Sequence, residues 1–209
     1  MTSPRSRVLP SARKHRPAFG AKHRPAFSAK HRPAFRPVAR GLALALVGKS
    51  RKDDQMDISI TEEPSRLAAV VRRVVPAAEI RSYFDSVYSD VAAALRAAGL
   101  APAGPALSWL HLDTPADHFD VAAGFPVEGV AIGTVSGEVE VVTISGGPAV
   151  VAELVGDYEE LPAAWQAVDN FREAEGLEPR GDALELYLTM PTPESDPAEN
   201  RTHLAMYLR

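Results

Sequence analysis

Apolar and polar residues alternate in eight short stretches from residue 57 onward, which is the pattern of β-strands with one buried face. Two further segments, 77–99 and 162–176, repeat apolar residues every three or four positions and therefore predict helices. Gly99 ends the first helix and Pro162 begins the second, in keeping with the usual preferences at helix ends. The predicted strands are 57–63, 66–75, 106–113, 118–127, 137–144, 149–156, 183–190 and 202–208.

The order of these elements predicts an internal duplication. An offset of 77 aligns residues 98–107 with 175–184, and six of these ten positions are identical. An offset of 80 aligns the sequence AVV at 69–71 with AVV at 149–151. We therefore expect an α+β fold built as a tandem βαββ repeat. Its curved antiparallel sheet would carry two helices on one face and a central groove on the other.

The stretch GDALELYLTMP, residues 181–191, predicts what lines this groove. Leu184 and the alternate residues after it form an apolar face, which we expect to pack under the helices. Glu185 and Tyr187 would then lie on the opposite face, in the groove. The offset of 77 matches Ser108 to Glu185 and Leu110 to Tyr187, and it predicts that Trp109 belongs to the core on the helix side.

Charge divides the chain into two regions. Residues 1–55 contain 14 Lys and Arg against two Asp, and they repeat KHRPAF three times. Residues 56–209 contain 9 Arg, no Lys and 25 Asp and Glu. The first region has too few apolar residues for a core, and we predict that it is a disordered basic extension. The second predicts a folded acidic domain that does not bind nucleic acid.

Three interpretations of the basic extension are open. It could bind nucleic acid through its basic and Phe residues, or it could be a targeting leader. We favour a third interpretation, in which translation starts at Met56 or the extension has no function. The apolar run 41–48 is too short to cross a membrane, which needs about 20 residues.

Three segments resemble the GyrI-like effector-binding family in their order and spacing. They are FDVAAGFPV at 119–127, GDYEELPAAW at 156–165 and LELYLTMP at 184–191. Members of this family stand alone or are attached to AraC- and MerR-type transcription regulators. The resemblance implies a tandem βαββ fold with a central pocket, where a strand-borne glutamate meets cationic aromatic ligands. That glutamate corresponds to Glu185 and the following tyrosine to Tyr187.

Each candidate residue also has a purely structural interpretation. A strand glutamate is ordinarily a solvated surface residue, but its neighbour Tyr187 and the predicted repeat axis favour a pocket role for Glu185. Cation–π contact with Tyr187 would then add about 0.5–2 kcal/mol to the binding of a cation. Tyr158 either packs at a strand end or lines the pocket. The remaining aromatic residues have helical spacing and are predicted to be core residues, namely Tyr83, Phe84, Tyr88, Trp165 and Phe171.

Other chemistry is not favoured by the sequence. The chain has no cysteine, which excludes disulfides and thiol catalysis and fits the cytoplasm. His111 with Asp113 and His118 with Asp120 could bind a metal, but we predict neither a metal nor a cofactor. No phosphate-binding or nucleophile-elbow motif is present.

These observations leave three functional hypotheses. The favoured one is a cytoplasmic, stand-alone effector-binding protein that holds a hydrophobic, cationic small molecule in the groove between the duplicated halves, beside a buried Glu185. It would act in transcription regulation or in the response to drugs and toxins. The second is a hydrolase of cyclopropanoid compounds, a reaction known in relatives of this fold, with Glu185 activating water and Tyr187 or Tyr158 stabilising the leaving group. The third is an acidic protein-binding module, as in gyrase-inhibitory relatives.

The basic extension generates the first testable prediction. The mass of the intact natural protein should place Met56 or Asp57 at its N-terminus, because the KHRPAF copies have the form of a small DNA duplication outside the folded domain. A mass that includes these copies would contradict this prediction.

Overall fold

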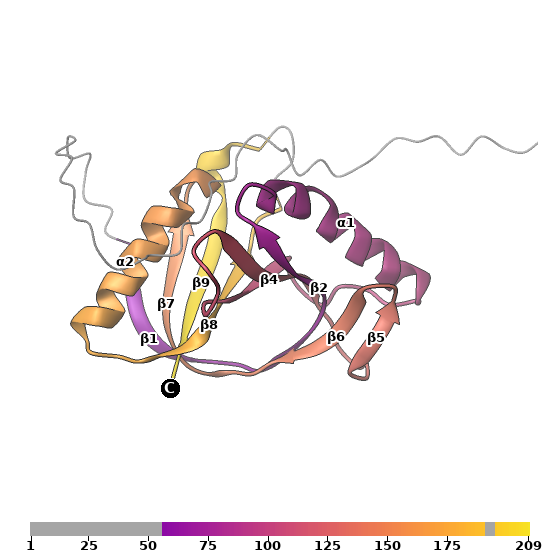
Figure 1. Cartoon of the computed structure of the whole chain (residues 1–209), viewed down its shortest axis with the longest axis horizontal. Coiled ribbons are helices and arrows are strands. Elements are labelled where there is room, and N and C mark those ends of the chain that lie inside the picture. Colours follow the sequence, from indigo (N-terminus) through magenta and orange to yellow (C-terminus); the bar gives the residue numbers. More distant parts are fainter. Residues whose placement is uncertain (1–55, 191–194) are drawn as a thin grey trace, which may run out of the picture.

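The computed structural model describes residues 56–190 and 195–209, which form one antiparallel sheet and two helices (Figure 1). The nine strands have the order β1-β7-β9-β8-β3-β4-β2-β6-β5, and the predicted α+β class is confirmed. The helices are α1 (Ile80–Ala97) and α2 (Leu161–Ala174), and short 3₁₀ turns lie at Tyr158–Glu160 and Pro197–Glu199. The strands are β1 (Ile58–Glu63), β2 (Arg66–Pro76), β3 (Leu107–His111), β4 (His118–Pro126), β5 (Gly133–Ser136), β6 (Val139–Ile144), β7 (Gly147–Val155), β8 (Pro179–Tyr187) and β9 (Arg201–Leu208).

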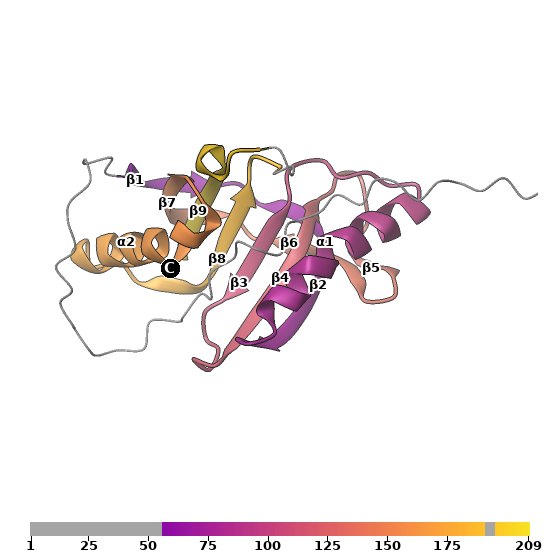
Figure 2. The same cartoon turned by 90° about the horizontal axis from the view of Figure 1, so that it is seen from above.

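Both helices pack on the same face of the sheet (Figure 2). Val87, Val91 and Leu95 of α1 and Trp165 and Val168 of α2 enter one core with the strand residues beneath them. The spacing of three and four residues that predicted the helices is therefore the spacing of their buried sides.

A second core fills the other face, where no helix lies. Its centre is formed by Leu107, Leu184 and Tyr207, each of which has no exposed surface. The connections β1–β2 and β6–β7 meet over this face. The backbone N–H of Gly146 donates to Ser65 Oγ at 2.8 Å, and a Cβ at Gly146 would lie 2.3 Å from the carbonyl oxygen of Glu63.

Arg180 of β8 holds this crossing against the sheet. Its guanidinium donates to the carbonyl oxygens of Ser145 and Gly146 at 2.9 Å and lies 4.2 Å from the centre of the Tyr207 ring. The same group forms a two-pronged ion pair with Asp182. A charged side chain therefore lies flat over the second core, and its planar fork provides five donors for this purpose.

The predicted assignment of the two sheet faces is wrong. Leu184 lies in the second core, away from the helices, whereas Glu185 and Tyr187 face the helices. Trp109 also packs against the second core rather than under the helices, and its indole N–H donates to Asp182. Alternation alone cannot identify the helix side when both faces of a strand are buried.

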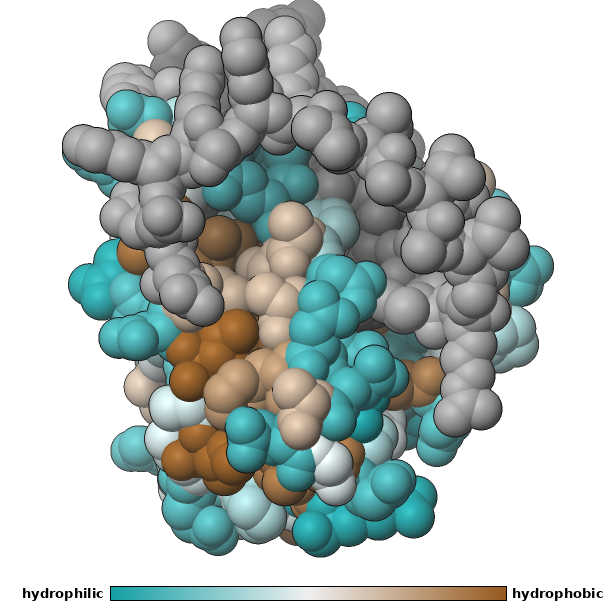
Figure 3. Space-filling view, turned by 90° about the vertical axis from the view of Figure 1, so that its left-hand side faces the viewer, coloured by the Kyte–Doolittle hydropathy of each residue, from teal (hydrophilic) through white to brown (hydrophobic). Residues whose placement is uncertain are grey.

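The remaining elements agree with the sequence pattern except at one point. All eight predicted strands and both helices are present, and the short, mostly exposed β5 was not predicted. β1 lies at one edge of the sheet and leaves Ile60 48% exposed. On the side of the molecule that carries β1 and α2, apolar residues gather among polar ones (Figure 3).

The structure tests one of two further predictions, that on membrane-spanning segments, and does not describe the region of the other. The hypothesis of a disordered basic extension concerns residues 1–55, which lie outside the described residues. Within the described ranges, neither helix is long and apolar enough to cross a membrane.

The crossing over the second core generates a stability prediction. Gly146→Ala should lower the free energy of unfolding by about 3 kcal/mol or more, because every atom near the added Cβ is backbone and cannot move aside cheaply. Gly137→Ala is the control, since its site is open and only its φ of 59° opposes a side chain. It should cost about 1 kcal/mol. Equal losses in urea unfolding would contradict the proposed crowding.

Candidate functional site

Glu185 lies at the centre of the sheet, where the two middle strands meet. β8 pairs with β3 so that Glu185 stands directly opposite Ser108. The Glu185 side chain points toward the helices and the residue is only 7% exposed. Its Oε1 atom accepts from the indole N–H of Trp165 at 2.8 Å, and its Oε2 atom accepts from the hydroxyl of Tyr187. Two neutral donors therefore hold a buried carboxyl group.

The hydrogen bonds continue from Tyr187 toward the other helix. The Oγ atom of Ser108 lies 2.9 Å from the hydroxyl oxygen of Tyr187 and 2.9 Å from that of Tyr88. Ser108 has no exposed surface, and Tyr88 comes from α1. A chain of five polar side chains thus runs from Trp165 on α2, through the two central strands, to α1.

Aromatic rings surround this chain. The ring of Tyr187 meets those of Tyr158 and Tyr88 edge to face, at centroid distances of 5.6 and 6.2 Å. Such contacts add about 0.5–1.5 kcal/mol beyond the area they bury. They also hold the Tyr187 hydroxyl in place beside Glu185.

No basic side chain neutralises Glu185 within the described residues. None of the ion pairs found there includes this carboxylate. Asp182, the other buried carboxylate on β8, differs in this respect because Arg180 pairs with it on the far face. If Glu185 is ionised, its charge is therefore available to a ligand.

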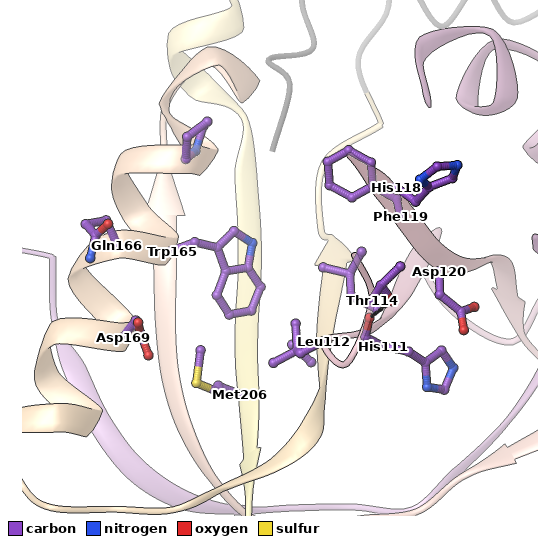
Figure 4. A pocket seen from close by; sticks show the side chains of 13 residues that line it. His111, Leu112, Thr114, His118, Phe119, Asp120, Trp165, Gln166, Asp169 and Met206 are labelled. Atoms are coloured by element: carbon purple, nitrogen blue, oxygen red, sulfur yellow. Dashed lines mark hydrogen bonds between the residues drawn. The ribbon is translucent and has the colours of Figure 1, made fainter. Parts of the chain in front are cut away.

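A cavity of about 220 Å³ lies next to this network, between α2 and the hairpin of β3 and β4 (Figure 4). The indole of Trp165 reaches from α2 toward Leu112 and Met206 (Figure 4). Trp165 lines the cavity, and its indole N–H donates a hydrogen bond to Glu185. Glu185 itself is not among the residues that line the cavity. Apolar lining also comes from Leu110, Phe119 and Ala183.

The polar rim of the cavity is mostly acidic or neutral. Asp169 and Gln166 of α2 lie on one side, and His111, His118 and Asp120 lie on the hairpin. Burial is the main cause that lowers the pKa of His111, which favours its neutral form. The hydrogen bond from Arg72 lowers the pKa of Asp120 and keeps it ionised. Asp169 is likewise paired with Arg172 at 2.8 Å, so both acids of the rim already have an arginine partner.

The predicted site residues differ in how directly they are connected to the carboxylate of Glu185. Tyr187 binds Glu185 directly, and Ser108 binds Tyr187. Tyr158 reaches the network only through its ring. Leu110 lines the cavity, but its strand partner is Ala183.

Sequence reasoning missed two members of the network, because Trp165 and Tyr88 were predicted to be core residues only. Both are buried, but each also sends a polar atom to a central strand. A signal was present in the sequence. The offset of 77 that relates Ser108 to Glu185 also relates Tyr88 to Trp165.

The His and Asp residues of the β3–β4 hairpin do not come together as a set of metal ligands. His111 stands opposite Asp120 in the register of β3 and β4. Asp120 instead forms a two-pronged ion pair with Arg72, at 2.7 and 2.8 Å. Across residues 56–190 and 195–209, no three His, Asp or Glu side chains are placed to hold a metal ion together.

A family model described as the GyrI-like small molecule binding domain matches residues 56–209. The chain belongs to this family. The sequence matches no curated protein. The resemblance inferred from the three sequence segments is therefore confirmed, and the match covers the whole of the folded GyrI-like domain.

Several solved structures share the fold of this GyrI-like domain. The EcmrR C-terminal domain is 19% identical with a TM-score of 0.62, and 74% of this chain matches 98% of it. EcmrR in its complex with DNA is 21% identical with a TM-score of 0.63, and 74% of this chain matches 57% of that longer chain.

Two further structures have the same fold. SAV2435 bound to tetraphenylphosphonium is 12% identical with a TM-score of 0.56, over 74% of this chain and 94% of that one. A hydrolase from Listeria innocua is 14% identical with a TM-score of 0.53, over 73% and 91%. At these identities the similarity concerns the fold of the GyrI-like domain, and function has to be argued from the site.

The bond between Trp165 and Glu185 generates a prediction. Trp165→Phe should lower the free energy of unfolding partly by leaving Oε1 of Glu185 without its indole donor, which costs about 1–3 kcal/mol. The measurement is urea unfolding of Trp165→Phe in the natural background and in a Glu185→Leu background. The substitution should cost less in the second. Equal costs would show that Trp165 contributes packing alone.

Proposed function

We propose that this protein binds a hydrophobic, cationic small molecule in the cavity between α2 and the β3–β4 hairpin. Glu185 provides the counter-charge. The observation that carries the proposal is a buried carboxyl group whose partners in the described residues are all neutral. Leaving a buried charge without an opposite charge is costly, so a bound cation gains more there than at the surface.

Trp165 controls how a ligand reaches this charge. The cavity of about 220 Å³ is smaller than the roughly 300–1,000 Å³ of most ligand sites. Turning the indole away would enlarge the cavity and open a path to Oε1 of Glu185. A cation would then replace the indole N–H as the partner of this oxygen, and the aromatic walls would add cation–π contact.

We infer that the site lies between two duplicated halves. The segments β2-α1-β3-β4 and β7-α2-β8-β9 have the same local strand order, β3-β4-β2 and β8-β9-β7. Each helix sends an aromatic residue to a polar residue of its own half, Tyr88 to Ser108 and Trp165 to Glu185. The cavity uses α2 of one half and the hairpin of the other. At the paired central position, the second half supplies an acid, Glu185, where the first half has Ser108.

The relatives support the chemistry and the biological setting of this proposal. SAV2435 was solved with tetraphenylphosphonium, which is an aromatic cation. EcmrR was solved with DNA. We infer a cytoplasmic role in transcription regulation or in the response to such compounds. The net negative charge of residues 56–209 makes the folded domain itself a poor partner for nucleic acid.

A hydrolase remains the second hypothesis because one relative of the same fold is named a hydrolase. As for a cation, the indole of Trp165 would have to turn away before Glu185 could bind a water as a general base. Binding is the better-supported function because SAV2435, a relative of the same fold, was solved with an aromatic cation. Incubation of the protein with a reactive cyclopropane, followed by mass spectrometry, would reveal turnover. Binding to a basic protein that Glu185→Gln leaves unchanged would instead favour the protein-binding module.

A matched pair of small probes tests the proposed function. Phenyltrimethylammonium is a cation, and tert-butylbenzene is its uncharged isostere. The full chain should bind the cation more tightly in a calorimetric titration, and Glu185→Gln should weaken this binding about tenfold or more. The affinity for tert-butylbenzene should change less than about twofold, because its contacts are with the apolar walls alone.

Asp182→Asn is the matched control for removing a buried carboxylate. Asp182 also accepts from a tryptophan indole, but it lies on the far face beside Arg180. The Asp182→Asn substitution should leave the affinity for phenyltrimethylammonium unchanged. Equal binding of both probes, or an equal loss in both variants, would reject Glu185 as the counter-charge.

A further inference from the structure

The three hydroxyl groups behind Glu185 form a chain in which each bond has a determinable direction. Tyr187 donates its only hydroxyl hydrogen to Oε2 of Glu185. In its contact with Ser108 at 2.9 Å, the Tyr187 oxygen must therefore accept, and Ser108 must donate. Ser108 then has no hydrogen left for its contact with Tyr88, so Tyr88 donates to Ser108.

The hydrogens thus all point one way, from Tyr88 through Ser108 and Tyr187 to the carboxylate. Tyr187 and Ser108 each donate one bond and accept another, and such chains strengthen their members by roughly 10–30% per bond. The direction can also reverse. A protonated Glu185 would donate to Tyr187, and the last hydrogen, that of Tyr88, would reach the carbonyl oxygen of Leu107 at 3.4 Å.

We propose that Ser108 is a positioning residue that holds Glu185 ready for a cation. It joins Tyr88 to Tyr187 and aims the Tyr187 hydroxyl at the carboxylate, while the reversible chain keeps a partner for every hydroxyl when Glu185 takes up a proton. That this positioning serves cation binding rests on the proposed function, whereas the hydrogen bonds of the chain are present without any ligand. Ser108, which has no exposed surface, acts through Tyr187 and does not touch the ligand.

The groups packed around Glu185 come from neighbouring strands, both helices and the far side of the cavity. Ser108 is on β3, and the partner of Glu185 on β9 is Leu204. Tyr187, Tyr88 and Tyr158 are the titratable groups closest to it in the network. Across the cavity, the hairpin contributes His111, His118 and Asp120, and α2 contributes Asp169.

The indole N–H of Trp165 offers a direct readout of Glu185. Its nitrogen NMR resonance should change with pH as Glu185 gains or loses a proton, because the two groups are hydrogen-bonded at 2.8 Å. Glu185→Gln should abolish this change and so identify the titrating group. Trp109, the only other tryptophan, donates to Asp182 on the far face and reports on general unfolding in the same spectrum.

Ser108→Ala should move the midpoint of the Trp165 change to higher pH, because the carboxylate loses part of its hydrogen-bond support through Tyr187. Ser108→Thr keeps the hydroxyl and should restore the natural midpoint. Tyr88→Phe removes the far end of the chain and should give a smaller shift in the same direction. The double variant Ser108→Ala/Tyr88→Phe should match Ser108→Ala, because Tyr88→Phe keeps the ring and the Tyr88 hydroxyl joins the chain through Ser108.

Three results would overturn the proposal. They are an unchanged midpoint in Ser108→Ala, equal shifts in Ser108→Ala and Ser108→Thr, and additive shifts in the double variant. Should Ser108→Ala fail to fold, Tyr88→Phe alone decides, and a midpoint that does not move overturns the proposal. The titrations contain no ligand. A shifted midpoint with no binding of phenyltrimethylammonium would reject the proposed function and leave the role of Ser108 standing.

Discussion

A buried carboxyl group whose partners among residues 56–190 and 195–209 are neutral donors is the constraint around which this domain is organised. Glu185 sits on a central strand under two helices, where an ionised group is unfavourable unless hydrogen bonds stabilise it. Trp165 supplies one bond from α2, and Tyr187 supplies the other. The helix side of the sheet therefore contains both the main core and the Glu185 carboxyl group.

The second core makes this arrangement possible. Glu185 can face the helices because the opposite face of β8 is buried independently, under the crossing of the short β1–β2 and β6–β7 connections. Arg180 fastens the crossing and neutralises Asp182 there. The two buried carboxylates of one strand thus have different surroundings, since Asp182 pairs with Arg180 whereas the partners of Glu185 in the described residues are neutral.

The fold could be predicted well from the sequence and the site only in part. Helices and strands followed from periodicity, and β5 was missed because Gly133–Ser136 is short and largely exposed. The repeat offset and the strand pattern related Glu185, Tyr187 and Ser108 to one another, and in the structure these three are in contact. Trp165 and Tyr88 were taken for packing residues, because a buried aromatic ring gives no sign in the sequence of where its polar atom points.

The sequence by itself determined the number and kind of the main elements, the acidic character of the domain and its family. These follow from local periodicity and from residue types, which act over a few neighbouring positions. Only the tertiary structure decided which face of β8 meets the helices and which donors reach Glu185. Those contacts join residues far apart in the chain, and on a strand buried on both sides the alternation fits either orientation.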